Sequence, residues 1–137
     1  MKRPVDYLRR LEKAYFRLLE VLENYNPSEL DIALDATIQR FEFTFELSWK
    51  AIKKFTEFVG LEGCNSPRSC IKLAYRLGWI SDQRQWLNLL EARNLTSHTY
   101  DIATAWRVYD LVKENYKAFE ELIEKLKGLL REETSNG

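Results

Sequence analysis

The chain holds a single histidine, His98, within the stretch EARNLTSHTYD. Arg93 lies five residues before it, Asn94 follows the arginine, and Tyr100 lies two residues after the histidine. An imidazole, with its ordinary pKa of about 6.5, can accept and release protons near neutral pH. A guanidinium is a permanent cation that can bind a phosphate through two hydrogen bonds. Together these side chains suit cleavage of RNA by its own 2′-hydroxyl group, with histidine transferring protons and arginine stabilising the transition state.

For these two side chains to act together, a helix must end between them. Five positions correspond to about 140° around an ideal helix, so Arg93 and His98 cannot share one helical face. The segment TSHT, residues 96–99, contains poor helix formers whose hydroxyl groups compete for backbone hydrogen bonds. Asp101 is a suitable N-cap for a following helix. We therefore expect the motif to lie on a helix–helix turn at one end of a bundle.

Two interpretations of this motif stay open from spacing alone. An arginine and a histidine near a helix end can simply cap it, since both cations interact favourably with the last carbonyl groups. A pattern of six residues has little specificity, so the cap is the more frequent explanation. In a catalytic site, one histidine cannot be acid and base in the same concerted step. Two copies of His98 in a homodimer would supply both.

The remaining sequence predicts an all-α fold. Apolar residues recur every three or four positions with few glycines or prolines, as in amphipathic helices. The architecture expected is an antiparallel bundle with a four-helix core, built from three long and two shorter helices. The expected helices are 5–24, a second from a Ser28 cap to Val59, a third from Ser66-Pro67 to Leu77, a fourth from Ser81 or Asp82, and the last from Ile102 to Leu130. Residues 1–130 would form one domain, and 131–137, REETSNG, a polar tail that frays.

Composition limits the classes of function. Twenty-one Lys and Arg balance 21 Asp and Glu among 137 residues, so an anionic ligand would have to bind at a local basic patch. No apolar run approaches the roughly 20 residues of a membrane span, and no signal peptide is recognisable, so we expect a cytoplasmic protein. Cys64 and Cys70, with one histidine elsewhere, make a poor zinc site. We expect them to be reduced thiols and the protein to bind no metal.

The second helix carries features with alternative meanings. Phe43, Leu47 and Ala51 form an apolar stripe beside the main one, which would face either the core or a partner chain. Glu46 and Lys50 lie on the polar side of the same helix. Charged residues in such positions usually form a solvated face, and we assign them to one.

The motif Arg93-x-x-x-x-His98-x-Tyr100, within RNLTSHTY just before a long final helix, resembles the HEPN superfamily and its HepT-like branch. The segment FEFTFELSWK and the SPR entry at Ser66 are similar to those of the nucleotidyltransferase substrate-binding proteins of the same branch. The resemblance extends from about Leu8 to Leu126.

The resemblance implies a metal-independent endoribonuclease toxin. Arg93 and His98 would be catalytic, with Asn94 in a supporting role, in a cleft shared by a homodimer. A minimal nucleotidyltransferase would act as antitoxin and transfer AMP from ATP, with magnesium, to Tyr100. The chain itself would need no cofactor, and its partners would be RNA and the transferase, without DNA or membrane.

Two other hypotheses remain. In the first, the chain is a non-catalytic subunit that presents a substrate or nucleotide to the transferase. The zero net charge favours this hypothesis because it provides no extended RNA track. In the second, the chain is a structural helical dimer whose motif only caps a helix.

Overall fold

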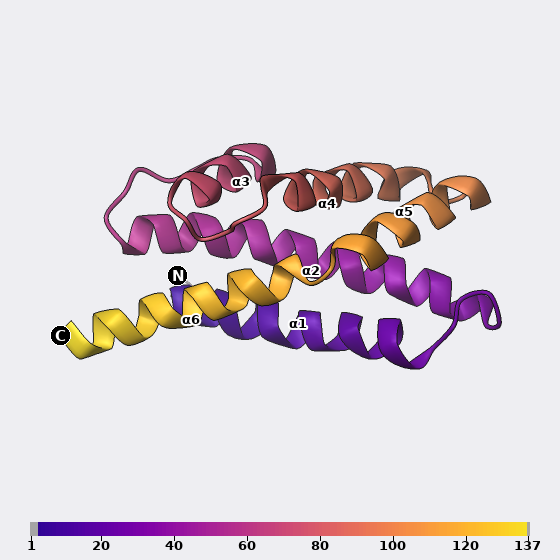
Figure 1. Cartoon of the computed structure of the whole chain (residues 1–137), viewed down its shortest axis with the longest axis horizontal. Helices are drawn as coiled ribbons and strands as arrows, with labels where there is room; N and C mark the ends of the chain where they lie inside the picture. Colours follow the sequence, from indigo (N-terminus) through magenta and orange to yellow (C-terminus); the bar gives the residue numbers. More distant parts are fainter. Residues whose placement is uncertain (1–2, 137) are drawn as a thin grey trace.

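The computed structural model describes residues 3–136 and confirms the all-α prediction (Figure 1). Within that range the chain forms six α-helices and one short 3₁₀ helix, and no strand. Their bounds are α1 Pro4–Asn24, α2 Asp31–Phe58, α3 Pro67–Arg76, α4 Gln83–Leu95, η1 Thr96–His98, α5 Ile102–Asn115 and α6 Ala118–Asn136.

Helix α2 is the central element of the bundle. It packs against each of the other five α-helices in the described range. Helices α1 and α2 run antiparallel along the length of the molecule, and α3 and α4 lie along the other side of α2 from α1 (Figure 1). Helix α5 packs on α4 and α2, whereas α6 packs on α1, so the chain ends near the end at which it begins.

The start of α2 corrects the predicted capping residue. The helix begins at Asp31, and its N-cap is Leu30, which has no side-chain cap. Ser28 instead belongs to a preceding turn, where its backbone N–H and its hydroxyl both donate to Asn26 Oδ1, at 3.0 and 2.7 Å. Ser28 therefore bonds to the side chain of Asn26 and does not cap α2.

The predicted final helix is wrong in one respect, because it is two helices. The break lies at Tyr116–Lys117, which contains neither proline nor glycine. Asn115, the last residue of α5, is buried, and its Nδ2 donates to the Leu111 carbonyl of the same helix at 2.7 Å. Beyond it, Phe119 N–H donates to the Tyr116 carbonyl, a tighter three-residue bond. Because of this bend, α5 packs on α4 whereas α6 packs on α1. Helix α6 then continues to Asn136, through most of the segment that we expect to fray.

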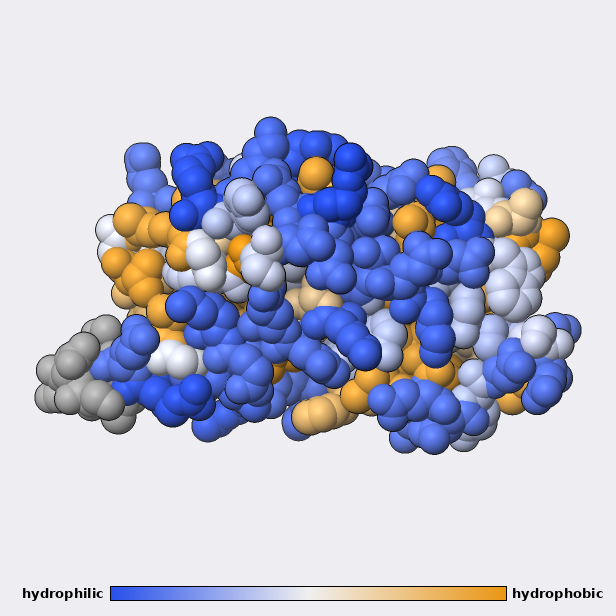
Figure 2. All heavy atoms as spheres, in the orientation of Figure 1, coloured by the Kyte–Doolittle hydropathy of each residue, from blue (hydrophilic) through white to orange (hydrophobic). Residues whose placement is uncertain are grey.

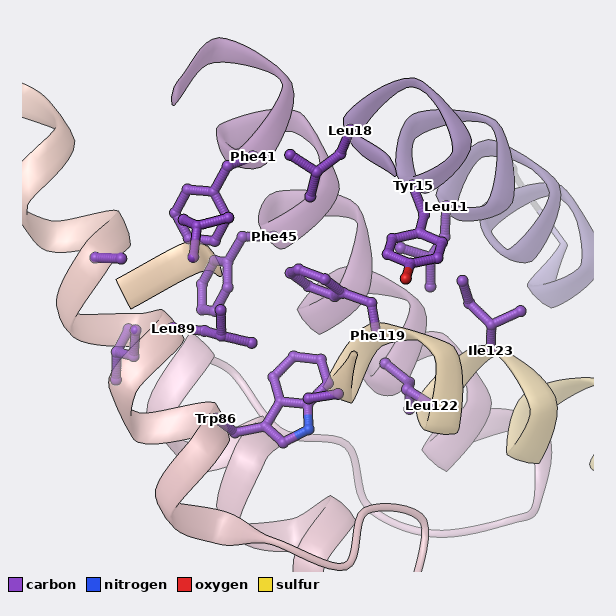
Figure 3. Close-up of a cluster of buried hydrophobic side chains, with 14 of the residues drawn as sticks. Leu11, Tyr15, Leu18, Phe41, Phe45, Trp86, Leu89, Phe119, Leu122 and Ile123 are labelled. Carbon is purple, nitrogen blue, oxygen red and sulfur yellow. The ribbon is translucent and has the colours of Figure 1, made fainter. Parts of the chain in front are cut away.

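An aromatic cluster joins the helices at the centre of the core (Figure 3). Phe119 of α6 contacts rings from three other helices. Its centroid lies 5.4 Å from that of Trp86, 6.4 Å from that of Phe41 and 6.0 Å from that of Tyr15. Burial and a 2.6 Å hydrogen bond to Glu120 raise the pKa of the Tyr15 phenol above its ordinary value. Phe119 thus ties α6 to α1, α2 and α4 at once.

The cysteine prediction is wrong. Cys64 and Cys70 form a disulfide, with Cα atoms 5.0 Å apart. The loop before α3 folds back on the helix start, because the backbone N–H groups of Asn65 and Ser66 both donate to Ser69 Oγ. Ser66 is the predicted N-cap, accepting from Ser69 N–H, so the cap itself brings the cysteines within bonding range.

The face of the molecule in Figure 2 is mainly polar. On the face in Figure 2, hydrophilic residues cover the middle of the bundle, and hydrophobic ones gather in small patches towards its ends. Among residues 3–136, no helix is long and apolar enough to cross a membrane. Of the stripe considered for a partner chain, Ala51 belongs to the core and Leu47 is half-buried, whereas Phe43 is 53% exposed. The stripe therefore leaves one aromatic ring uncovered in this chain.

The cluster yields a prediction for stability. Phe119→Ala should lower the free energy of unfolding by about 3–5 kcal/mol, because it removes a fully buried ring and leaves a cavity. Urea denaturation followed by circular dichroism measures the change. Phe16→Ala is the matched control, since that ring is 62% exposed and its loss should change stability by less than about 0.5 kcal/mol. Equal losses for both variants would contradict the assigned role of Phe119.

Candidate functional site

The predicted turn between Arg93 and His98 is present. Helix α4, capped by Asp82, ends at Leu95, and the single 3₁₀ turn η1 then carries the chain to His98. Asp101 caps α5, as expected, by accepting from Ala103 N–H at 3.3 Å. Arg93 therefore projects from the last turn of α4, whereas His98 belongs to the turn itself.

Threonine hydroxyls, and not the two cations, satisfy carbonyl groups at the end of α4. Thr96 Oγ1 donates to the Arg93 carbonyl at 2.7 Å, and Thr99 Oγ1 donates to the Thr96 carbonyl at 3.2 Å. Within residues 3–136, no hydrogen bond runs from the side chain of Arg93 or His98 to a backbone carbonyl. The cap interpretation of the motif therefore has no support in these contacts.

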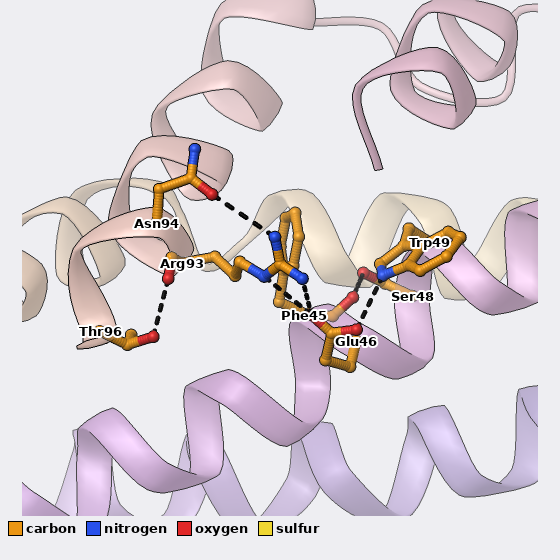
Figure 4. A network of polar contacts seen from close by, with 7 residues as sticks. All are labelled: Phe45, Glu46, Ser48, Trp49, Arg93, Asn94 and Thr96. Carbon is orange, nitrogen blue, oxygen red and sulfur yellow. Dashed lines mark hydrogen bonds and ion pairs between the residues drawn. The ribbon is translucent and has the colours of Figure 1, made fainter. Parts of the chain in front are cut away.

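The side chain of Arg93 is held by a carboxylate on α2 (Figure 4). Its Nε and Nη2 both lie 2.9 Å from Glu46 Oε1, and its Nη1 is 3.5 Å from Asn94 Oδ1. The other carboxylate oxygen, Oε2, accepts from Trp49 Nε1 at 2.9 Å. Glu46 thus orients the guanidinium while Trp49 orients Glu46, and Nη1 keeps capacity for a further acceptor.

Glu46 is the site residue that sequence reasoning missed. The pattern of charges predicts a solvated position for it, but only 33% of its side chain is exposed and its Oε1 lies 2.9 Å from Arg93 Nη2. It lies 47 residues from Arg93 in the chain. No spacing rule relates two helices at that separation, so only the packing of α4 on α2 shows the pairing.

His98 and Tyr100 form the other half of the arrangement. Their ring centroids are 6.1 Å apart with planes at 75°, an edge-to-face contact. Both side chains face solvent, and Tyr100 is 86% exposed. The structure thus associates Arg93 with Asn94, and His98 with Tyr100. Among the described residues, no hydrogen bond joins the two pairs.

A hollow of about 530 Å³ lies between the turn and α2. Thr99 lines one side, and Asp35, Gln39 and Glu42 line the other. Burial raises the pKa of the Glu42 carboxyl, the nearby Glu46 carboxylate raises it further, and Arg93 lowers it. The hollow is therefore acidic and does not favour a phosphate. In the described part of the chain, no three His, Cys, Asp or Glu side chains converge as metal ligands.

Comparison with known proteins identifies the family. The model of the family "Nucleotidyltransferase substrate binding protein like" matches residues 6–128. The chain belongs to this family. The expected resemblance to HepT-like members of the HEPN superfamily is thereby confirmed.

Individual relatives agree with this membership of the nucleotidyltransferase substrate-binding family. A Haemophilus influenzae protein named "Probable ribonuclease HepT" is 33% identical over 101 residues, covering 71% of this chain and 69% of the relative. A crystal structure from Thermus thermophilus is 35% identical with a TM-score of 0.76, covering 85% of this chain and 98% of its own. A second structure, from Haemophilus influenzae, is described as the fold of a substrate-binding domain of a nucleotidyltransferase. It is 27% identical with a TM-score of 0.75, covering 88% and 98%.

The Arg93–Glu46 contact gives a testable coupling. Because each side chain is about one-third exposed (36% and 33%), a double-mutant cycle of Arg93→Gln and Glu46→Gln should give about 0.5–1 kcal/mol. Glutamine at position 46 can still accept from Trp49 Nε1, so the cycle isolates the arginine contact.

The matched control is the pair Arg107–Glu91, 3.5 Å apart and 57% and 51% exposed. Its Gln–Gln cycle should give a coupling near zero. Chemical denaturation of the four proteins in each cycle measures both values. A coupling for Arg93–Glu46 no larger than that of the control would show that Glu46 does not hold the guanidinium in solution.

Proposed function

We propose that this chain is a metal-independent endoribonuclease that acts as a homodimer, with Arg93 and His98 as its catalytic residues. The observation that carries the proposal is the local geometry of the motif. Arg93 is oriented by Glu46 and His98 is exposed on η1, while threonine hydroxyls bond to the Arg93 and Thr96 carbonyls. Both side chains are therefore available for a ligand. The probable ribonuclease among the relatives supports the same chemistry.

The reaction follows from the two side chains. One His98 imidazole accepts the proton of a 2′-hydroxyl as its oxygen attacks the adjacent phosphorus. Arg93 Nη1, bound only weakly by Asn94, donates to the phosphoryl oxygen on which negative charge develops. The bond to the 5′-oxygen breaks, and the partner subunit's His98 donates the proton that this oxygen takes up. The products are a 2′,3′-cyclic phosphate and a free 5′-hydroxyl.

Cleavage of a single-stranded RNA with chelator present tests this proposal. His98→Ala and Arg93→Ala should each lower the rate by about 100-fold or more, because each removes a group that acts in the transition state. Ser97→Ala is the matched control, since Ser97 lies exposed on the same turn and should leave the rate unchanged. Equal cleavage by the wild type and both motif variants would assign any activity to a contaminant.

We further propose that a minimal nucleotidyltransferase is the partner and that Tyr100 accepts AMP from it, as in a toxin–antitoxin pair. The family supports a transferase partner, and the 86% exposure of Tyr100 supports attack by its hydroxyl. The Tyr100 oxygen would bond to the α-phosphorus of ATP, releasing pyrophosphate and the phenolic proton. The attached nucleotide would then add bulk and negative charge beside His98, whose ring lies 6.1 Å from that of Tyr100.

Incubation with the cognate transferase, ATP and magnesium should add one AMP to the chain, measured by intact-mass and peptide mass spectrometry. Tyr100→Phe should abolish the addition because it lacks the accepting oxygen. Tyr75→Phe, which alters another exposed tyrosine, should leave it unchanged. Modification that persists in Tyr100→Phe would place the acceptor elsewhere and end this part of the proposal.

A non-catalytic substrate-binding subunit is the second candidate function. The family of this chain and one of its solved relatives are described as substrate-binding, which favours this function. In that case the purified protein would leave RNA intact while binding the transferase tightly. The cleavage assay above separates the two functions.

A further inference from the structure

A groove of about 560 Å³ between α1 and α2 lies outside the motif just described. Three cations of α1 line one wall: Arg10, Lys13 and Arg17. Their spacing of three and four residues places them on one helical face, over about 10 Å of its length. All three are exposed, and within residues 3–136 no ion pair or side-chain hydrogen bond engages them. Their charges are therefore available to an anion.

The opposite wall, on α2, offers an aromatic surface. Phe43 and Leu47 line it, and Phe43 is 53% exposed. Arg40 closes one end, where its Nη1 donates to the Arg17 carbonyl at 2.8 Å and to Glu20 Oε1 at 3.1 Å. Because the two helices run antiparallel, this contact fixes the register, and the far end of the groove lies beside Arg10 and Leu47. The α1 wall of the groove is basic, whereas the α2 wall combines the apolar Phe43 and Leu47 with the charged Arg40 and Glu46.

The far end of the groove meets the motif. Glu46 belongs to the lining of the groove, and its Oε1 is the atom that holds Arg93 Nε and Nη2 at 2.9 Å. The acidic hollow beside Thr99, by contrast, is lined by Asp35 and Glu42. The cations of α1 therefore attract a polyanion that approaches Arg93 along the groove, and the carboxylates of the hollow repel one that approaches from that side.

We infer that the α1–α2 groove binds single-stranded RNA next to the cleaved phosphate, with Arg10, Lys13 and Arg17 contacting phosphates and Phe43 stacking on one base. This inference rests on the proposed function for its substrate class. A row of cations facing an exposed aromatic ring is the combination that single-stranded nucleic acid requires, because cations follow the backbone and a ring stacks on any base. The groove also accounts for RNA binding by a chain of zero net charge, since the basic patch is local.

The test measures binding of a short fluorescein-labelled RNA by anisotropy, in the His98→Ala background so that the strand stays intact. Lys13→Ala/Arg17→Ala should raise Kd about ten-fold or more and make the salt dependence of log Kd shallower by about 1.4, the value for two lost phosphate contacts. Lys72→Ala/Arg76→Ala is the matched control. It removes a lysine and an arginine at the same spacing from the exposed face of α3 and should leave Kd within about two-fold.

The aromatic contact is tested separately. Phe43→Ala should weaken binding roughly ten-fold without changing the salt dependence, because stacking releases no counterions. Phe43→Trp should restore binding, since a larger ring also stacks. If Phe43→Trp binds as weakly as Phe43→Ala, stacking is excluded.

The oligomeric state of each variant, from light scattering, completes the test. If the groove variants dissociate a dimer and lose RNA binding only for that reason, the groove is an interface between copies and the inference fails. It also fails if the wild type cleaves RNA while the Lys13/Arg17 and Lys72/Arg76 variants bind RNA alike. If the wild type leaves RNA intact but the groove variants still bind it more weakly, the ribonuclease proposal fails and the groove remains an RNA-binding site.

Discussion

The packing of α2 against all five other α-helices is the constraint on which the rest of the described structure depends. A helix that packs against all five others needs a wide and continuous apolar face. Phe41, Phe45, Ile52 and Phe55 are fully buried along α2, at spacings of four, seven and three residues that place them on one such face. Trp86 of α4 packs against Phe45 from one side, with ring centroids 6.5 Å apart. This contact fixes where α4 lies along α2 and therefore where α4 ends. The same packing of α4 on α2 places Arg93 beside Glu46, so the geometry of the site depends on the hydrophobic core.

The elements that sequence could predict are those set by local interactions. The periodicity of apolar residues located the helices, and the caps at Ser66, Asp82 and Asp101 are present because each uses an acceptor within three residues of the donor it satisfies. The turn between Arg93 and His98 followed from the same kind of argument. Wrong predictions arose where two local bonds compete. Asn26 accepts the hydrogen bonds of Ser28, and the Asn115 side chain bonds to the Leu111 carbonyl immediately before the break in the predicted final helix.

The parts that sequence could not predict depend on distances between segments. The disulfide requires the loop and the first turn of α3 to approach, and counting cysteines does not measure that approach. Glu46 and the groove need the register of α2 against α4 and α1. The α1 cations are visible as a helical pattern in the sequence, but nothing there indicates that Phe43 faces them. Net charge also averages over the chain, so a total of zero is compatible with a basic groove and an acidic hollow that both lie along α2.

The strength of the Arg93–Glu46 contact decides whether Arg93 can serve an anionic ligand. In a fully buried pair the guanidinium would not be free to bind another anion, because separating two buried opposite charges costs several kcal/mol, roughly 3–5. Here both side chains remain about one-third exposed, at 36% and 33%, where ion pairs contribute about 1 kcal/mol or less. A phosphate held nearby by the α1 cations can then compete for Nη1 without breaking the bonds to Glu46 Oε1. The carboxylate orients the arginine at small energetic cost, and the local cations supply the attraction for the strand that the chain as a whole lacks.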